Sequence, residues 1–226
     1  MNLSIKKISI SAVLLGVLVF TLYFFASWKI SHLKNLEQFT QWLNDKDNEC
    51  LMERNIAGVK VNVKYYPPLY SALNDMNIQY SNQDKKHEID SVLNVRNNIM
   101  TFLFSIGPDK NIPSERQVSS IMSEGVSGYS SFVERVMSTN FMMDQNISLY
   151  VDGVKYSPLL CVVENVYELS DTRNFVVIFG SEGKNINEGK EYIFEYNDLY
   201  FGMGKVQFVF SNKALDAARK IKVINS

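Results

Sequence analysis

The sequence predicts an α+β fold, with a single transmembrane helix at the N-terminus followed by a β-rich, sandwich-like extracytoplasmic domain that carries a few short helices. Three observations predict this fold. An uncharged apolar run lies near the N-terminus, hydrophobic residues make up 46% of the chain, and short β-prone segments bounded by Gly, Asn, Asp and Ser dominate from about residue 144 onward. Short strands at such spacing are typical of β-sandwiches.

The apolar run is Ile8–Trp28, which has 21 residues and no charge. A helix that rises about 1.5 Å per residue would cross roughly 30 Å of hydrocarbon over this length. Lys6 and Lys7 precede the run, while Trp28 and Lys29 close it, as is typical of the two membrane interfaces. A cleaved secretory signal is the alternative, but its apolar core would be shorter and would end in small residues. We therefore expect an uncleaved anchor that holds the chain in a lipid bilayer.

The basic residues around the run slightly favour a cytoplasmic N-terminus, which places the rest of the chain in the periplasm or at the cell surface. No repeat or obvious linker divides the remaining sequence. We expect a cytoplasmic segment (1–7), the anchor (8–28), a juxtamembrane helical stalk (29–57) and a globular α+β domain (58–226). Within that domain we expect a mixed lobe over 58–143 and a β-rich lobe over 144–226.

The segment after the anchor repeats apolar residues at helical spacing, at Leu33, Leu36, Phe39 and Leu43. We expect a helix whose apolar face packs on its own domain, because the stripe is too short for a coiled coil. Alternation from Gly58 onward then predicts a half-buried strand, which Pro67-Pro68 ends and a short helix follows. Residues 98–106 are apolar on both faces and predict a central strand, and the charged segment 79–90 predicts a solvated loop.

Two capping patterns predict helices in the middle of the chain. Ser114 and Gln117 indicate a helix over 115–123, and Ser131 and Glu134 indicate a helix over 131–143. Asp152-Gly153 tolerates positive φ and predicts a tight hairpin. Further strands are expected at Leu159–Val166, Asn174–Phe179, Glu191–Tyr196 and Lys205–Ser211, followed by a short helix in NKALDAARK and an edge strand in KIKVI.

No catalytic signature is present, so we expect a protein that is not an enzyme and has no cofactor or metal. The two histidines, His32 and His87, have no evident partner for general-base or nucleophilic chemistry. Carboxylates could pair for glycoside cleavage, but the acidic residues in the C-terminal part fit strand faces and turns more simply, at Glu188, Glu191, Glu195 and Asp198. The glycines of Phe201-Gly202-Met203-Gly204 fit a β-turn.

Cys50 and Cys161 match no metal or redox spacing. In an oxidising compartment they could form one disulfide that closes a long loop and stabilises the fold by about 4–5 kcal/mol. Two separate buried thiols are the alternative, since the sequence does not show whether their Cα atoms come within reach.

The function expected from this layout is a non-catalytic interaction or structural role in a bacterial envelope, as an accessory of a secretion or surface assembly, although the layout identifies no family. The net charge of −1 gives no reason to expect nucleic acid as a partner. The alternative is a ligand- or glycan-binding domain whose tyrosine-rich turns stack on sugars or hold a peptide, with candidate surface residues Tyr66, Tyr70, Tyr196 and Tyr200.

Overall fold

The computed structural model describes residues 32–75, 91–96, 98–113, 118–164, 171–183 and 185–223. The predicted anchor Ile8–Trp28, the loop 79–90 with His87, and the Ser114 and Gln117 cap lie outside these residues. Within the described ranges, no helix combines the length and the apolar character that a membrane span requires. The α+β class, rich in β-sheet and with few helices, is confirmed.

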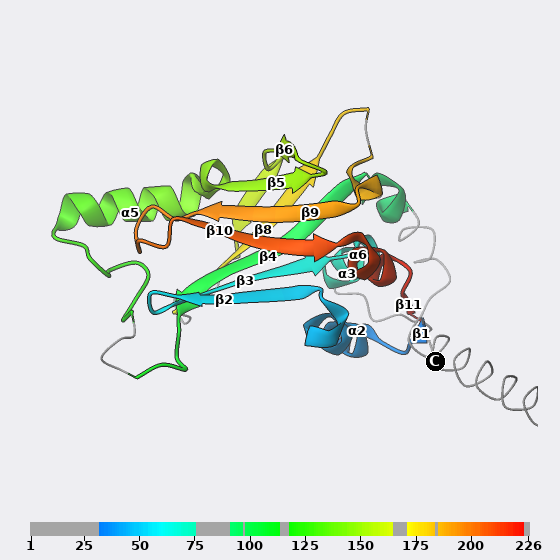
Figure 1. Ribbon diagram of the computed structural model, residues 1–226, viewed down its shortest axis with the longest axis horizontal. Coiled ribbons are helices and arrows are strands. Elements are labelled where there is room, and N and C mark those ends of the chain that lie inside the picture. The colour runs from blue at the N-terminus through cyan, green and yellow to red at the C-terminus, as the bar shows by residue number, and fades with distance from the viewer. Residues whose placement is uncertain are drawn as a thin grey trace, which may run out of the picture.

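The first sheet is antiparallel and has the strand order β2-β3-β4-β8-β7 (Figure 1). Every other residue of β3 from Val59 to Tyr65 is buried, as the alternating sequence predicted, and β4 lies at the centre. The strands are β2 (Leu51–Ile56), β3 (Val59–Tyr66), β4 (Ile99–Pro108), β7 (Leu160–Val163) and β8 (Arg173–Gly180). The helical stalk over 29–57 is wrong in its last part, because Ala57-Gly58 turns at positive φ and pairs β2 with β3.

The second sheet has the strand order β10-β9-β5-β6. Its strands are β5 (Ile147–Val151), β6 (Val154–Tyr156), β9 (Glu191–Asn197) and β10 (Lys205–Ser211). Asp152 and Gly153 join β5 to β6 with φ values of 50° and 81°, so the predicted hairpin is confirmed.

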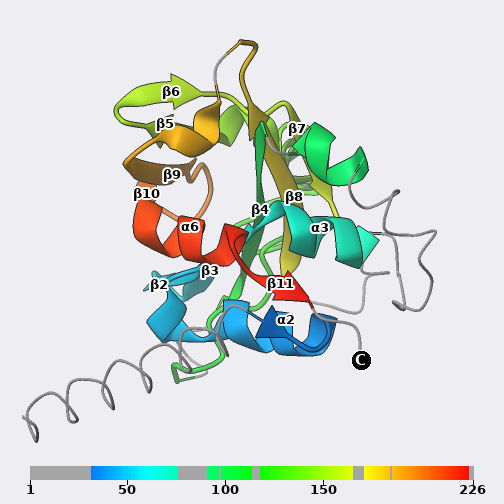
Figure 2. The ribbon, with the colours of Figure 1, turned by 90° about the vertical axis from the view of Figure 1, so that its right-hand side faces the viewer.

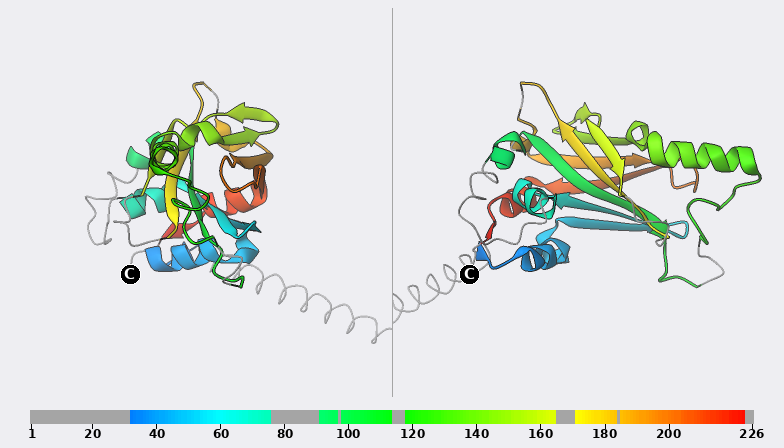
Figure 3. Two further views of the ribbon diagram at one scale, coloured as in Figure 1. Left: turned by 90° about the vertical axis from the view of Figure 1, so that its left-hand side faces the viewer. Right: turned by 180° about the vertical axis from the view of Figure 1, so that it is seen from behind.

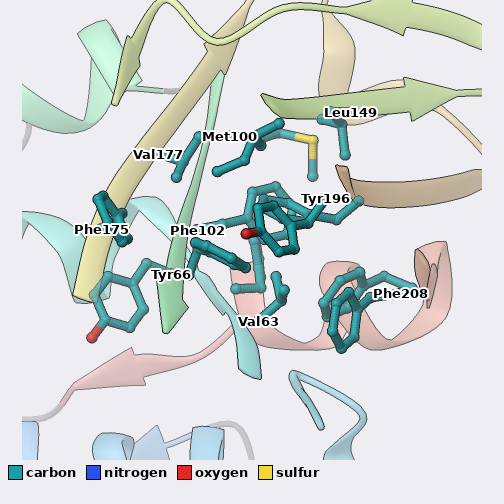
Figure 4. Packing of buried hydrophobic residues seen from close by; sticks show 14 of the residues in the cluster. Val63, Tyr66, Met100, Phe102, Leu149, Phe175, Val177, Tyr196 and Phe208 are labelled. Carbon is teal, nitrogen blue, oxygen red and sulfur yellow. The ribbon is translucent and has the colours of Figure 1, made fainter. Parts of the chain in front are cut away.

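The core lies between the inner faces of these two sheets (Figure 4). The ring centroid of Phe102 on β4 lies 5.5 Å from that of Phe194 on β9 and 5.5 Å from that of Phe210 on β10. Phe104 and Tyr196 make a second contact between the sheets, at 4.9 Å. Because β8 pairs with β4, strands from both expected lobes share the first sheet, and the lobes are not separate units.

Short helices cover one end of the two sheets (Figure 2). The predicted packing of α2 on its own domain is confirmed, since Phe39 and Leu43 are fully buried. This helix starts only after Asn35, whose side chain accepts a hydrogen bond from the amide of Gln38. The elements here are β1 (His32–Leu33), α2 (Leu36–Asn44), η1 (Lys46–Asn48), α3 (Pro68–Asp75), η4 (Ile186–Glu188), α6 (Asn212–Arg219) and β11 (Lys222–Val223), and β1 pairs in parallel with β11.

Helix α5 (Tyr129–Phe141) projects from the opposite end of the molecule and is followed by η3 (Met143–Asn146) (Figure 1). It begins two residues before the predicted start, because Gly128 is the N-cap and Ser131 occupies the third helical position, where its Oγ accepts from the Gly128 amide. The helix predicted over 115–123 is wrong over its described part, since residues 118–125 form bends and turns that end at Gly125 with φ of 68°.

Candidate functional site

The candidate site is helix α5, which projects from one end of the domain (Figure 3). Its polar residues Arg135 and Thr139 are buried against the domain, whereas its large apolar residues face solvent. A helix on the surface of a soluble domain normally has the reverse arrangement. Arg135 and Thr139 are buried, whereas Tyr129 and Phe141 have 83% and 71% of their surface exposed. This inversion singles out α5 as a functional element.

Arg135 holds the inner face of α5 against two loops. Its Nη1 donates to the carbonyl oxygen of Ile121 at 2.7 Å, and its Nη2 donates to that of Glu124 at 3.0 Å. The guanidinium also lies 4.0 Å from the ring centroid of Tyr200 and 5.2 Å from that of Phe201. A buried guanidinium needs such partners because its desolvation is costly.

The second of these loops, residues 198–204, is fixed by the carboxylate of Asp198. Its two oxygens accept hydrogen bonds from the amides of Tyr200, Phe201 and Met203, at 2.8 to 3.1 Å. Gly202 and Gly204 adopt positive φ in this turn, as expected from the β-turn interpretation of the sequence. The turn presents two aromatic rings to Arg135 and thereby sets the position of α5.

The outer surface of α5 carries large apolar side chains at helical spacing. We call this surface the α5 apolar face and define it by Tyr129, Phe132, Val133, Met137 and Phe141, all of which are exposed. Strand β7 contacts α5 and ends the first sheet, and its Leu160 and Val162 are exposed as well. Large exposed apolar side chains gathered on one element are typical of an interaction site.

The four tyrosines of the alternative hypothesis lie in two separate places. The ring centroids of Tyr66 and Tyr70 lie 4.8 Å apart, and the Tyr70 hydroxyl lies 3.1 Å from Thr40 Oγ1. Tyr196 is buried in the core, where desolvation raises the pKa of its phenol, and Tyr200 stacks on Arg135. Tyr66 borders a cavity of about 300 Å³ on the outer face of the first sheet, so the four rings do not share one surface.

The proposed Cys50–Cys161 disulfide is not formed, and both thiols are free. The carbonyl of Cys50 accepts from the Tyr65 amide, and the pairing then runs through Phe102 and Val177 to Cys161. The two cysteines thus lie at opposite edges of the first sheet, about 19 Å apart at the usual strand spacing, far beyond the reach of a disulfide.

The acidic residues singled out in the sequence have structural contacts. Glu195 accepts a hydrogen bond from Gln207 at 2.8 Å and pairs with Lys205 at 3.4 Å. Glu188 accepts from the Asn185 amide group, and Glu191 is exposed on β9. His32 lies in β1. No group of three or more His, Cys, Asp or Glu side chains among the described residues could hold a metal ion.

Comparisons with known proteins identify no family. No protein-family model and no curated protein matches the chain. Among solved structures, a crystal structure of a novel protein of unknown function from Burkholderia pseudomallei K96243 is similar at 8% sequence identity and a TM-score of 0.36, over 84% of this chain and 96% of that one. A likeness this distant carries no functional argument, so the candidate site rests on the geometry of α5.

Proposed function

We propose that this chain is a single-pass membrane protein whose extracytoplasmic domain binds another envelope protein through the α5 apolar face and performs no catalysis itself. It would serve as an accessory of a secretion or surface assembly. The observation that carries this proposal is the inverted polarity of α5. Because Arg135 is buried on the inner side of the helix, the apolar side chains on the other side are exposed to solvent.

The position of α5 favours a protein over a lipid as the occupant of this face. The described residues begin with β1 (His32–Leu33), and α5 projects from the opposite end of the molecule (Figure 1). The apolar run Ile8–Trp28 precedes that strand, so an anchor formed by it would hold the β1 end at the bilayer. The α5 apolar face then points to the region away from that bilayer.

The length of α5 favours a groove of a different protein over a second copy of this chain. The helix has 13 residues, fewer than two heptads, which is too short for a stable two-stranded coiled coil. A short helix can bind in a preformed groove through apolar residues that share one stripe, and positions i, i+3, i+4 and i+8 belong to such a stripe. Tyr129, Phe132, Val133 and Met137 have this spacing.

Site-specific photocrosslinking in the native host tests the docking proposal. A photoreactive amino acid at Tyr129 should give a product whose mass differs from that of a dimer of this chain. The double substitution Phe132→Ser and Met137→Ser should lower its yield at least tenfold, because each lost apolar contact is worth about 1 kcal/mol or more. Val209→Ser, which changes an exposed apolar residue on β10, is the matched control and should leave the yield unchanged.

Two outcomes would contradict the docking proposal. A product of twice the chain mass would show that α5 pairs with a second copy. A yield that the double substitution lowers no more than Val209→Ser would show that the face is not the contact surface.

The anchor has a separate test. The full chain should stay in the membrane fraction after alkaline carbonate extraction, and protease added to intact spheroplasts should degrade the domain. Release by carbonate would exclude a transmembrane anchor, and protection from protease would reverse the proposed orientation.

A further inference from the structure

A cavity of about 570 Å³ lies at the β1 end of the molecule, between α3, η4, α6 and β11. The elements α3, α6 and β11 face the viewer in Figure 2. One part of its wall is apolar and comes from Pro68, Leu69, Leu93 and Ile221. Its volume suits a small molecule, and it is separate from the α5 apolar face, which lies at the opposite end of the molecule (Figure 1).

The polar part of the wall carries two cationic side chains. Arg219 donates to the amide oxygens of Asn187 and Asn212, at 3.2 and 3.1 Å, and both acceptors are neutral. Among the described residues, Arg219 makes no ion pair with a carboxylate, and Lys222 beside it makes none either. The cavity also contains Asp216, but its carboxylate pairs with Lys220 at 2.5 Å. The excess charge in the cavity is therefore positive.

The surroundings of Arg219 do not neutralise this charge. The hydroxyl groups of Tyr65 and Tyr192 are buried and have no hydrogen-bond partner of regular geometry. Burial raises the pKa of Tyr65 to about 12, and the charge of the nearby Arg219 acts against this increase. The phenols stay neutral at physiological pH, so Arg219 remains available for an external anion.

The geometry points to a binding site for a phosphate ester that carries an apolar substituent. Arg219 and Lys222 would contact the phosphate, since guanidinium groups bind phosphate with two parallel hydrogen bonds. Leu69, Leu93 and Ile221 would contact the apolar part. The backbone of His32 in β1 pairs with that of Lys222 in β11, and Lys222 lines the cavity. The cavity therefore lies where the chain enters the domain after the segment that contains Ile8–Trp28. An anionic phospholipid is the source that this position favours, and only this choice rests on the proposed anchor.

Native mass spectrometry of the full chain in detergent micelles tests the site with two probes. Dihexanoyl phosphatidylglycerol supplies the phosphate with an apolar part, and inorganic phosphate supplies the anion alone. We expect the amphiphile to bind at least tenfold more tightly than inorganic phosphate. Arg219→Gln and Lys222→Gln should each weaken its binding at least fivefold, whereas Lys213→Gln, which removes an exposed cation from the same helix outside the cavity, should not.

The design separates loss of binding from loss of folding. Arg219 makes hydrogen bonds within the domain, so the melting temperature of Arg219→Gln is compared with that of the original chain. Lys222 is exposed, so its substitution removes the charge without removing a buried contact. The proposal is overturned if neither substitution weakens amphiphile binding beyond Lys213→Gln. Equal affinity for inorganic phosphate would also overturn it, because the apolar wall would then contribute nothing. Carbonate extraction reports on the anchor independently of both results.

Discussion

At the scale of single residues, the environment of Arg135 determines which face of α5 is buried. A guanidinium in the interior needs hydrogen bonds, and the carbonyl groups of Ile121 and Glu124 supply them. The exposed aromatic residues on the opposite side of the helix follow from this choice. The sequence could not reveal it, because a buried arginine and a solvated one look alike in a helical pattern.

The first prediction concerns this arginine. Arg135→Met should lower the free energy of unfolding by about 2–4 kcal/mol, because two charge-assisted hydrogen bonds are lost and two carbonyl groups lose their partner. Urea denaturation followed by circular dichroism measures the change. Arg54→Met, at an exposed arginine on β2, should change the free energy by less than about 0.5 kcal/mol, and equal effects would contradict the role given to Arg135.

The second prediction concerns the pH dependence of stability through Glu195. Burial raises the pKa of its carboxyl, but the hydrogen bond from Gln207 and the charge of Lys205 outweigh burial and lower the pKa overall. A carboxyl with a lowered pKa in the folded state stabilises the fold above its usual pKa, and this stabilisation is lost as the pH falls through the lowered value.

Glu195→Gln should therefore be less stable than the original chain at pH 7, by about 1 kcal/mol, and the difference should shrink as the medium is acidified below pH 4. Urea denaturation at several pH values measures this. Glu191→Gln, at an exposed position of the same strand, is the matched control and should change the free energy of unfolding at pH 7 by less than about 0.5 kcal/mol. If the stability difference between Glu195→Gln and the original chain does not vary with pH, the Glu195 carboxylate does not stabilise the fold in the way described.

At the scale of elements, close approach between β5 and the start of β9 gives a third prediction. A Cβ atom on Gly189 would lie 2.2 Å from Val151 Cγ1 and 3.3 Å from the Tyr192 ring. Gly189→Ala should cost about 1–3 kcal/mol, because these buried neighbours cannot move freely. Gly128→Ala, where a Cβ would meet nothing within 4 Å, should cost less than about 1 kcal/mol. Thermal unfolding compares the two, and similar losses would contradict the packing account.

The elements that the sequence predicted correctly are those with local signals. Strand β3 alternates apolar and polar residues, and Asp152-Gly153 turns at positive φ whatever the rest of the fold does. The capping pattern at Ser114 and Gln117 predicted a helix over 115–123, but residues 118–125 form turns. The carbonyl groups of Ile121 and Glu124 accept hydrogen bonds from Arg135, and Gly125 turns the chain at positive φ. The capping pattern at Ser131 and Glu134 predicted a helix in this region, but a cap does not say which face of the helix is covered.

At the scale of the whole molecule, the order of strands could not be derived from the sequence. The chain passes from the first sheet to the second after β4, returns for β7 and β8, and leaves again for β9 and β10. Each strand segment is compatible with several partners, so local patterns do not determine this path. The disulfide hypothesis failed for this reason, since the pairing of β4 with β8 places Cys50 and Cys161 at opposite edges of the first sheet.

The fourth prediction follows from the separation of the cysteines. A reducing agent should leave the melting temperature unchanged, because no disulfide stabilises the fold. Burial raises the pKa of Cys50 and Cys161 to about 12, with Glu49 and Asp144 adding to the increase, so almost no thiolate exists at pH 8. Reaction with N-ethylmaleimide should be slow in the native protein and fast in guanidinium chloride. A drop in melting temperature on reduction would contradict this account.

The parallel pairing of β1 with β11 has a consequence for biosynthesis. His32–Leu33 leaves the ribosome before the rest of the domain, whereas Lys222–Val223 leaves it after the other strands of the two sheets. The first strand therefore stays without its partner while the rest of the domain is made, and loop closure over this distance comes last. The pairing of β1 with β11 can therefore form only after the whole domain has been translated.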